Sequence, residues 1–98
     1  MARVEITARA LSDLERLFEF KAERNPRKAR KQLLSVRRAL ELLADHPLLG
    51  RDAEDGRREL ILLRGRDGYI AKHRWLPAEE IVLILAVRHH REAGYSEE

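Results

Sequence analysis

The chain has 98 residues, of which 44% are hydrophobic and 38% are charged. This length suits one small domain, and the apolar fraction is too high for a disordered chain. We therefore expect a single folded domain over residues 1–98. Because the sequence contains no cysteine, it excludes a disulfide framework, a thiolate zinc site and a cysteine nucleophile.

No apolar run approaches the roughly 18 residues that a membrane-spanning helix needs. The first residues, Met1 to Glu5, carry charges and lack the hydrophobic segment of a signal peptide. We therefore expect a cytoplasmic protein that makes no contact with a membrane.

The net charge is +3, and 16 of the 20 basic residues are arginine, since only positions 21, 28, 31 and 72 carry lysine. Arginine makes bidentate contacts with phosphates and carboxylates. The bias fits a nucleic-acid surface or an acidic protein partner. A GC-rich coding sequence would produce the same bias without any physical cause, and composition does not separate the two explanations.

The first half of the chain predicts a strand followed by a helical hairpin. Val4 and Ile6 alternate with polar neighbours, which is typical of a strand over residues 3–7 with one buried face. Thr7 suits the N-cap of a first helix, whose apolar residues recur every three or four positions up to about residue 23. We expect the charged side chains of this helix, Asp13 among them, to face water.

A second helix is predicted to start at Asn25-Pro26, which provides an N-cap residue and a proline at the first helical position. An apolar stripe continues from Ala29 to Leu43, so this helix should end near Ala44. The very short connection makes the two helices a hairpin over about residues 8–44.

The second half predicts three strands, over residues 59–64, 69–76 and 81–88. Short turn sequences at 65–68 and 77–80 join them, so consecutive strands should be antiparallel neighbours. The run from Ile81 to Val87 is apolar at every position, which is typical of a central strand covered on both faces. The predicted fold is α+β, in the order β-α-α-β-β-β. Its helical hairpin packs on a small antiparallel sheet (about 3–7 and 58–88) whose first strand lies beside one of the later three.

Basic side chains gather near the ends of these strands. The candidate target-binding residues are Arg57, Arg58, Arg74, Arg88, His89, His90 and Arg91. The basic segment 88–98 has a simpler explanation, as a polar tail that keeps a strand end soluble. We expect no metal site, because adjacent histidines on an extended segment point in opposite directions and no spacing elsewhere completes three ligands.

General acid–base chemistry is an alternative use of the same region. A histidine titrates near neutral pH, and a tyrosine or an arginine can assist a leaving group or a developing negative charge. The candidate residues for such chemistry are His73, His89, Arg91 and Tyr95. For Trp75, we expect a packing role in the third predicted strand rather than base stacking.

Several ordered motifs resemble the RelE/ParE superfamily of toxin–antitoxin toxins. They are Ala10 with Asp13-Leu14, Asn25-Pro26 with Ala29, Leu43 followed by Pro47 and Gly50-Arg51, Gly68-Tyr69 with Arg74, and Ile84-Leu85-Ala86-Val87-Arg88-His89 before Arg91-Glu92. The resemblance covers nearly the whole chain. No single motif is specific, but their order and spacing are, and the family's fold agrees with the element order predicted from the residues.

The resemblance implies a toxin, and the superfamily contains two mechanisms. RelE-like members are ribosome-dependent endoribonucleases that cut mRNA, whereas ParE-like members poison DNA gyrase. Ile70 stands where RelE-like enzymes carry an arginine, and their lysines before and within the second strand are also absent here. The tail Arg88–Glu92 and the long hairpin resemble ParE-like sequences. We therefore predict a ParE-type gyrase poison that is not itself an enzyme.

Two other functions stay open at this point. A RelE-type ribonuclease would act on the ribosome and mRNA and use His89, Arg91 and Tyr95, with His73 as a further candidate. A non-toxic domain that binds nucleic acid or protein is the second. For a toxin, the resemblance implies a small acidic antitoxin that folds across the hairpin and the edge strand, and it implies no cofactor.

Overall fold

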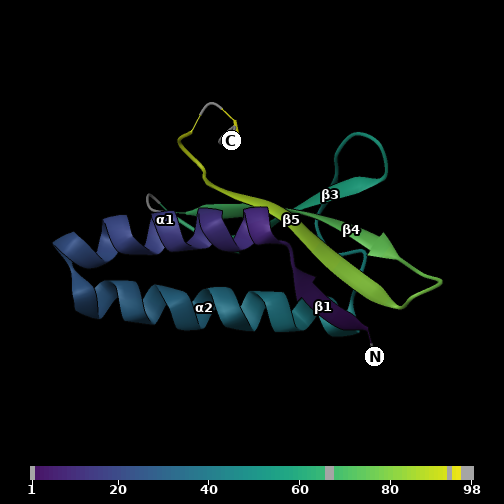
Figure 1. Ribbon diagram of the computed structural model, residues 1–98, viewed down its shortest axis with the longest axis horizontal. Helices are drawn as coiled ribbons and strands as arrows, with labels where there is room; N and C mark the ends of the chain where they lie inside the picture. Colours follow the sequence, from purple (N-terminus) through teal and green to yellow (C-terminus); the bar gives the residue numbers. More distant parts are fainter. Residues whose placement is uncertain (1, 66–67, 93, 96–98) are drawn as a thin grey trace.

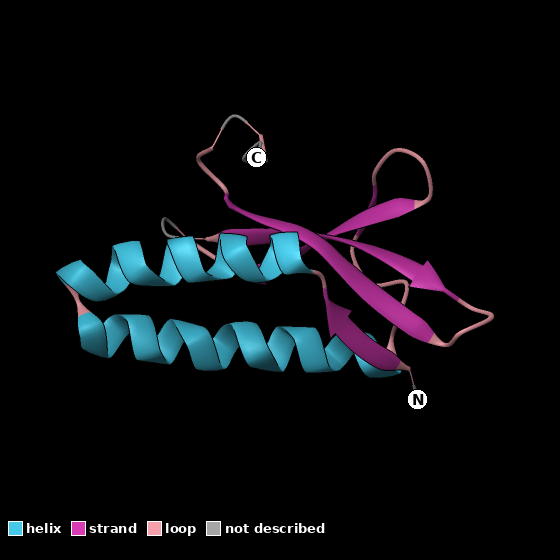
Figure 2. Ribbon diagram, in the orientation of Figure 1, coloured by secondary structure: helices cyan, strands magenta, loops and turns pink. Residues whose placement is uncertain are grey.

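The computed structural model describes residues 2–65, 68–92 and 94–95. Its elements, labelled in Figure 1, are β1 (Arg3–Ile6), α1 (Ala8–Arg24), α2 (Pro26–Asp45), β2 (Arg51–Asp52), β3 (Arg57–Leu63), β4 (Tyr69–Leu76) and β5 (Ile81–His89). The two helices lie side by side as one layer, and the strands form the other layer (Figure 2). The predicted α+β class and element order are confirmed.

Both helices begin where the sequence predicts. The Thr7 side chain accepts a hydrogen bond from the backbone N–H of Ala10, so Thr7 caps α1. The Asn25 side chain accepts from the N–H of Lys28, and Pro26 is the first residue of α2. Each cap satisfies backbone donors that a helix start leaves without partners, and the Asn25 cap fixes the tight turn between the two helices.

The strands form a mixed sheet in the order β1-β5-β4-β3-β2. The later strands pair antiparallel as predicted, but β1 runs parallel to β5, with Val4 opposite Val82. No short turn joins β1 to β5, since both helices and three strands lie between them in the chain, so turn chemistry does not set the direction of β1. The apolar strand β5 has an interior position, as its sequence predicts, but the helices cover only one of its two faces.

The short strand β2 is absent from the prediction, which treats residues 51–56 as a polar loop. Arg51 pairs with Glu59, and Asp52 pairs with Arg58. A strand of two residues has no periodicity to detect. Gly50 leads into it with a φ of 99°, and a Cβ there would lie 2.3 Å from the carbonyl oxygen of Glu59. This close approach explains why glycine precedes β2.

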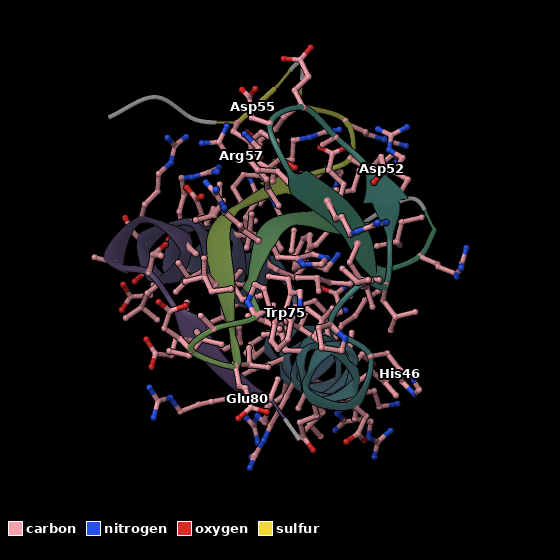
Figure 3. All side chains as sticks on the ribbon, turned by 90° about the vertical axis from the view of Figure 1, so that its right-hand side faces the viewer. His46, Asp52, Asp55, Arg57, Trp75 and Glu80 are labelled. Carbon is pink, nitrogen blue, oxygen red and sulfur yellow. The ribbon has the colours of Figure 1, made fainter. Side chains whose placement is uncertain are left out.

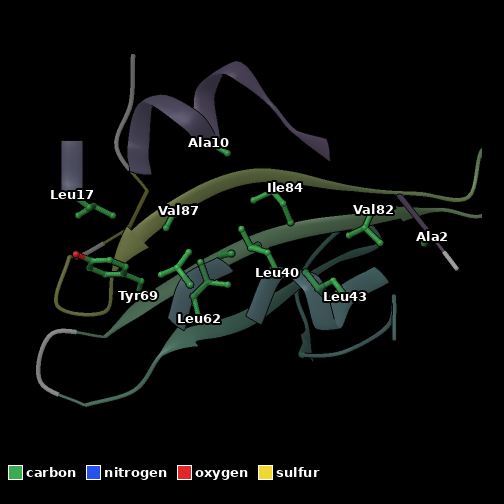
Figure 4. Packing of buried hydrophobic residues seen from close by; sticks show 12 residues of the cluster. Ala2, Ala10, Leu17, Leu40, Leu43, Leu62, Tyr69, Val82, Ile84 and Val87 are labelled. Carbon is green, nitrogen blue, oxygen red and sulfur yellow. The ribbon is translucent and has the colours of Figure 1, made fainter. Parts of the chain in front are cut away.

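The core lies between the helices and the sheet (Figure 4). Leu40 and Leu43 enter it from α2, and Val82, Ile84 and Val87 enter it from β5. Trp75 packs partly buried against this cluster, which confirms the packing role expected for it. The helices therefore cover one face of the sheet and leave the other to solvent.

Asp13 is wrongly predicted to face water, since only 2% of it is exposed. Its Oδ2 accepts a 2.9 Å hydrogen bond from the backbone N–H of Val87. Strand β1 pairs with β5 only as far as Ile84, so beyond that point β5 has no strand neighbour on this side. A carboxylate from α1 takes the place of the missing strand, which a helical periodicity does not reveal.

Candidate functional site

The solvent side of the sheet carries a cluster that we call the open face. It consists of Arg57, Glu59 and Ile61 of β3, Ile70, Lys72 and Arg74 of β4, and Arg88 of β5. Cross-strand pairing aligns these residues, with Arg57 opposite Arg74, Glu59 opposite Lys72, Ile61 opposite Ile70, and Ile70 opposite Arg88. Alternating residues of the same strands, such as Leu62, Ala71 and His73, are buried against the helices.

One end of the open face is strongly basic. Arg57 and Arg74 face each other directly across β3 and β4, an arrangement in which like charges are destabilising. Arg57 has a weak ion pair with Asp55 at 3.8 Å, and both side chains lie at the rim of the sheet, away from α2 (Figure 3). A pair of arginines held together in this way is suited to an anionic ligand.

Glu59 is the centre of a hydrogen-bonded group. Its Oε1 accepts two hydrogen bonds from the Arg51 guanidinium, at 2.7 and 3.1 Å. Its Oε2 accepts a 2.6 Å hydrogen bond from the hydroxyl of Tyr95. These contacts bring the segment after β5 back over the sheet and onto β3.

The ring of Tyr95 lies among cations. The ammonium of Lys72 is 4.3 Å from the ring centroid, and the guanidinium carbon of Arg88 is 5.4 Å from it. Arg88 also donates to the carbonyl oxygens of His89, His90 and Glu92. Arg88 therefore holds the chain after β5 in its turn, in addition to contributing charge to the open face.

The hydrogen bond between Tyr95 and Glu59 moves both pKa values. Donation from Tyr95, together with Arg51, lowers the pKa of Glu59 in spite of its partial burial. Burial and the bond to Glu59 raise the pKa of Tyr95 well above the ordinary value of a phenol. At neutral pH the carboxylate is therefore ionised and the phenol is neutral, so the tyrosine acts as a hydrogen-bond donor.

Among the predicted acid–base candidates, His73 lies away from the open face. It is fully buried, and its Nε2 is 2.9 Å from the carbonyl oxygen of Leu49. Because a carbonyl oxygen only accepts, Nε2 carries the proton, and the buried Nδ1 has no partner among the described residues. Burial lowers the pKa of His73, so the ring is neutral. It anchors the loop before β2 and does not reach solvent.

His89 and Tyr95 come from opposite sides of the sheet. Arg88 belongs to the open face, so His89, the next residue of β5, points to the other side. There its ring makes an edge contact with the buried Tyr69, with centroids 6.1 Å apart. Its Nδ1 accepts a hydrogen bond from the backbone N–H of Arg91. The structure brings His89 and Arg91 together, but it does not bring them together with Tyr95.

The remaining predicted residues lie at the margins. Arg58 points to the helix side of β3, where it pairs with Asp52 at 3.1 Å. His90 is exposed and stacks on His89, with ring centroids 5.1 Å apart. Within residues 2–65, 68–92 and 94–95, no three histidine or acidic side chains gather closely enough to hold a metal ion.

A second surface, which we call the groove, lies where α1, α2 and β1 meet. It encloses about 820 Å³ and is lined mainly by the apolar side chains Val4, Ile6, Leu11, Leu14, Phe18, Leu33, Val36 and Leu40. Its rim carries Glu15, Arg37, Glu41 and Asp45. Leu11 and Leu33 are about half exposed, so the groove leaves apolar surface open to water.

Neither Glu59 nor the part played by Lys72 is indicated by the sequence alone. Glu59 opens the run of residues 59–64 and reads as an ordinary charged strand end. Its role depends on two contacts that are distant in sequence, with Arg51 and Tyr95. The opposite charges of Glu59 and Lys72 would have pointed to this site only with the strand register known.

Comparison with known proteins identifies the family. A family model described as the ParE toxin of the type II toxin–antitoxin system, parDE, matches residues 4–94. The chain belongs to the ParE toxin family. It is also 34% identical over 92 residues to Toxin RelE3 of Caulobacter vibrioides, a match covering 94% of this chain and 98% of that protein.

This membership makes the chain a toxin of a type II toxin–antitoxin system, whose partner is a cognate antitoxin. The predicted family resemblance is thus confirmed. Of the toxin's described helices, none combines the length and the apolar character needed to cross a bilayer.

Proposed function

We propose that the toxin is a ParE-type poison of DNA gyrase that binds the DNA-cleaved state of the enzyme through its open face. The observation that carries this proposal is the separation of the residues expected to cleave RNA. Such a toxin needs a binding surface, and its own side chains cleave no bond.

RNA cleavage needs a base for the 2′-hydroxyl, positive charge for the phosphorane and an acid for the leaving oxygen. His73 is buried, and His89 lies on the opposite side of the sheet from Tyr95. The phenol of Tyr95 is committed to Glu59, whose lowered pKa makes it a weak base at neutral pH. These placements favour a binding surface over a catalytic centre.

The basic residues of the open face supply that surface. Arg57, Lys72, Arg74 and Arg88 come from three adjacent strands and face the same side of the sheet. Such a surface favours the phosphates of cleaved DNA or an acidic patch on gyrase. Arg91 is exposed just after β5, where its backbone N–H donates to His89.

We assign the groove to the antitoxin. An amphipathic helix fits an apolar groove of this kind, which runs between two helices and a strand. Because Glu15, Glu41 and Asp45 outnumber Arg37 on the rim, that helix should carry basic residues beside its apolar stripe. An acidic segment of the same antitoxin would then meet the open face.

A ribosome-dependent ribonuclease is the second candidate. Two observations favour it: the relative named Toxin RelE3, and the gathering of Tyr95, Lys72 and Arg88 on one face. In that case Tyr95 and these two cations would surround the scissile phosphate, and the bond from Tyr95 to Glu59 would have to open.

The test is to incubate the purified toxin with gyrase, ATP and supercoiled plasmid, in parallel with a ribosome-bound mRNA. The proposal predicts linearised plasmid and intact mRNA. The double variant Arg57→Ala, Arg74→Ala should lose plasmid cleavage, while the charge-matched control Arg27→Ala, Arg38→Ala, with both changes on exposed positions of α2, should retain it. If the mRNA is cut and the plasmid stays supercoiled, the proposal is overturned and the second candidate is supported.

A further inference from the structure

Glu59 is the one acidic member of the open face, and it is well ordered by its neighbours. Its side chain is only 13% exposed, and the Arg51 guanidinium and the Tyr95 hydroxyl hold both of its oxygens. A carboxylate in this position neutralises charge at the centre of a basic surface.

The cations around it have few other counter-charges. Among the described residues, Lys72, Arg74 and Arg88 have no carboxylate within 4.0 Å, and Arg57 has only Asp55, which is largely exposed. Arg57 and Arg74 also repel each other across the strands. These cations can therefore bind an anion in addition to Glu59.

The cations follow the sheet in successive rows. Arg57 and Arg74 form the first row, Glu59 and Lys72 the second, and Ile61, Ile70 and Arg88 the third. Successive rows lie about 6.6 Å apart, since a strand rises about 3.3 Å per residue. A sheet face with cations in successive rows, the exposed Ile61 and the partly buried Ile70 suits an extended single strand, whose phosphates and bases meet both kinds of side chain.

We propose that Glu59 is an internal counter-anion, which competes with the phosphates of a single-stranded nucleic acid for the open face. The inference rests on the proposed use of this face for an anionic target. A phosphate entering the second row takes over the hydrogen bonds that Arg51 now donates to Glu59, and it lies beside the ammonium of Lys72. The cavity of about 340 Å³ beside Glu59 gives it room. Its lining includes the cations Arg51, Arg57 and Lys72 and the exposed carboxylates Asp52 and Glu54.

Tyr95 contacts both Glu59 and Lys72 and so affects how a phosphate reaches them. Its hydroxyl holds one oxygen of Glu59, and its ring covers the ammonium of Lys72. The side chain therefore screens the second row as long as Glu59 is ionised. Entry of a phosphate requires this contact to open.

The test compares charge removal with removal of the hydrogen bond. Affinities of wild type, Glu59→Gln and Tyr95→Phe for a labelled oligothymidine and an oligouridine are measured by fluorescence anisotropy across a range of salt concentrations. Glu59→Gln should bind both strands at least threefold more tightly, and the slope of log K against log salt should steepen by about 0.7 for each added phosphate contact. Tyr95→Phe, which keeps the carboxylate, should change the affinity less.

The matched control is Glu54→Gln, because Glu54 lines the same cavity but is exposed. Glu59→Ala is included because a glutamine oxygen can still accept the hydrogen bond from Tyr95, whereas alanine cannot. Equal gains for Glu59→Gln and Glu54→Gln would mean that net charge alone acts, and equal effects of Glu59→Gln and Tyr95→Phe would mean that Glu59 only positions Tyr95. Either result, or weaker binding by both Glu59 variants, overturns the inference. These assays contain no gyrase, so they fail or succeed independently of plasmid cleavage.

Discussion

The groove and the open face belong to one small domain but differ in chemistry. The groove is apolar with a mostly acidic rim, whereas the open face carries arginines and a lysine. Apolar surface gains most from a partner that excludes water, and a basic face attracts anions over longer distances. The function proposed above uses this difference, with the antitoxin in the groove and the cellular target on the open face.

The largest effect is expected from a charge placed in the groove. Leu33→Glu should weaken antitoxin binding at least a hundredfold, about 3 kcal/mol, because the carboxylate is buried against apolar side chains in the complex. Leu34→Glu is the control, since Leu34 is similarly exposed but does not line the groove. Isothermal titration calorimetry with the antitoxin measures both. Equal losses would remove the groove from the interface.

Removing two arginines of the open face should weaken target binding without lowering the stability of the fold. The double variant Arg57→Ala, Arg74→Ala should weaken target binding by about 2 kcal/mol, as expected when two arginines that contact the target are removed. Its free energy of unfolding should rise by up to about 1 kcal/mol, because a like-charged cross-strand pair disappears. Urea denaturation and a target-binding assay are compared on the same preparation. A clear fall in stability would mean that these arginines support the fold.

Asp13 joins α1, which lines the groove, to β5, which carries part of the open face. Asp13→Ala should lower the free energy of unfolding by about 1–3 kcal/mol, since the N–H of Val87 loses its buried acceptor. Glu19→Ala, an exposed acidic position on the same helix, should change it by less than about 0.5 kcal/mol. Chemical denaturation measures both variants, and similar values would contradict the role given to Asp13.

The smallest effect is a pH dependence of stability from His73. Burial lowers its pKa below the ordinary value of 6.5, so the unfolded chain binds this proton more readily than the folded one. Stability should therefore fall as the pH drops from 6.5 towards the folded pKa, and be fully present above 6.5. His73→Gln, which retains a donor for Leu49, should lose this component in denaturation curves between pH 5 and 8. His46→Gln, at an exposed position, should keep it.

Local signals in the sequence predicted most of the fold. Thr7, Asn25 and Pro26 act within one helical turn, and the apolar run of β5 marks an interior strand whatever its neighbours are. The direction of β1 and the burial of Asp13 depend on contacts between distant segments, which periodicity does not record. Both were therefore missed.

The candidate site was predicted in composition but not in arrangement. Arg57, Arg74 and Arg88 share a face because of the strand register, and strand alternation divides His89 from Tyr95. The contact between Glu59 and Tyr95 joins residues 36 positions apart and has no local signature. The site residues remain predictions. The structure places Arg57, Arg74 and Arg88 on the open face and His73 and His89 on the other side of the sheet, so mutations can test the two sides separately.

One assay tests most directly whether the two surfaces have separate functions: gyrase-dependent plasmid cleavage by wild type, Leu33→Glu and the Arg57→Ala, Arg74→Ala double variant, each with and without the antitoxin. We expect the antitoxin to silence wild type but not Leu33→Glu, and we expect the double variant to cleave nothing while still binding the antitoxin. Full cleavage by the double variant, or silencing of Leu33→Glu at the wild-type antitoxin concentration, would contradict this division of function.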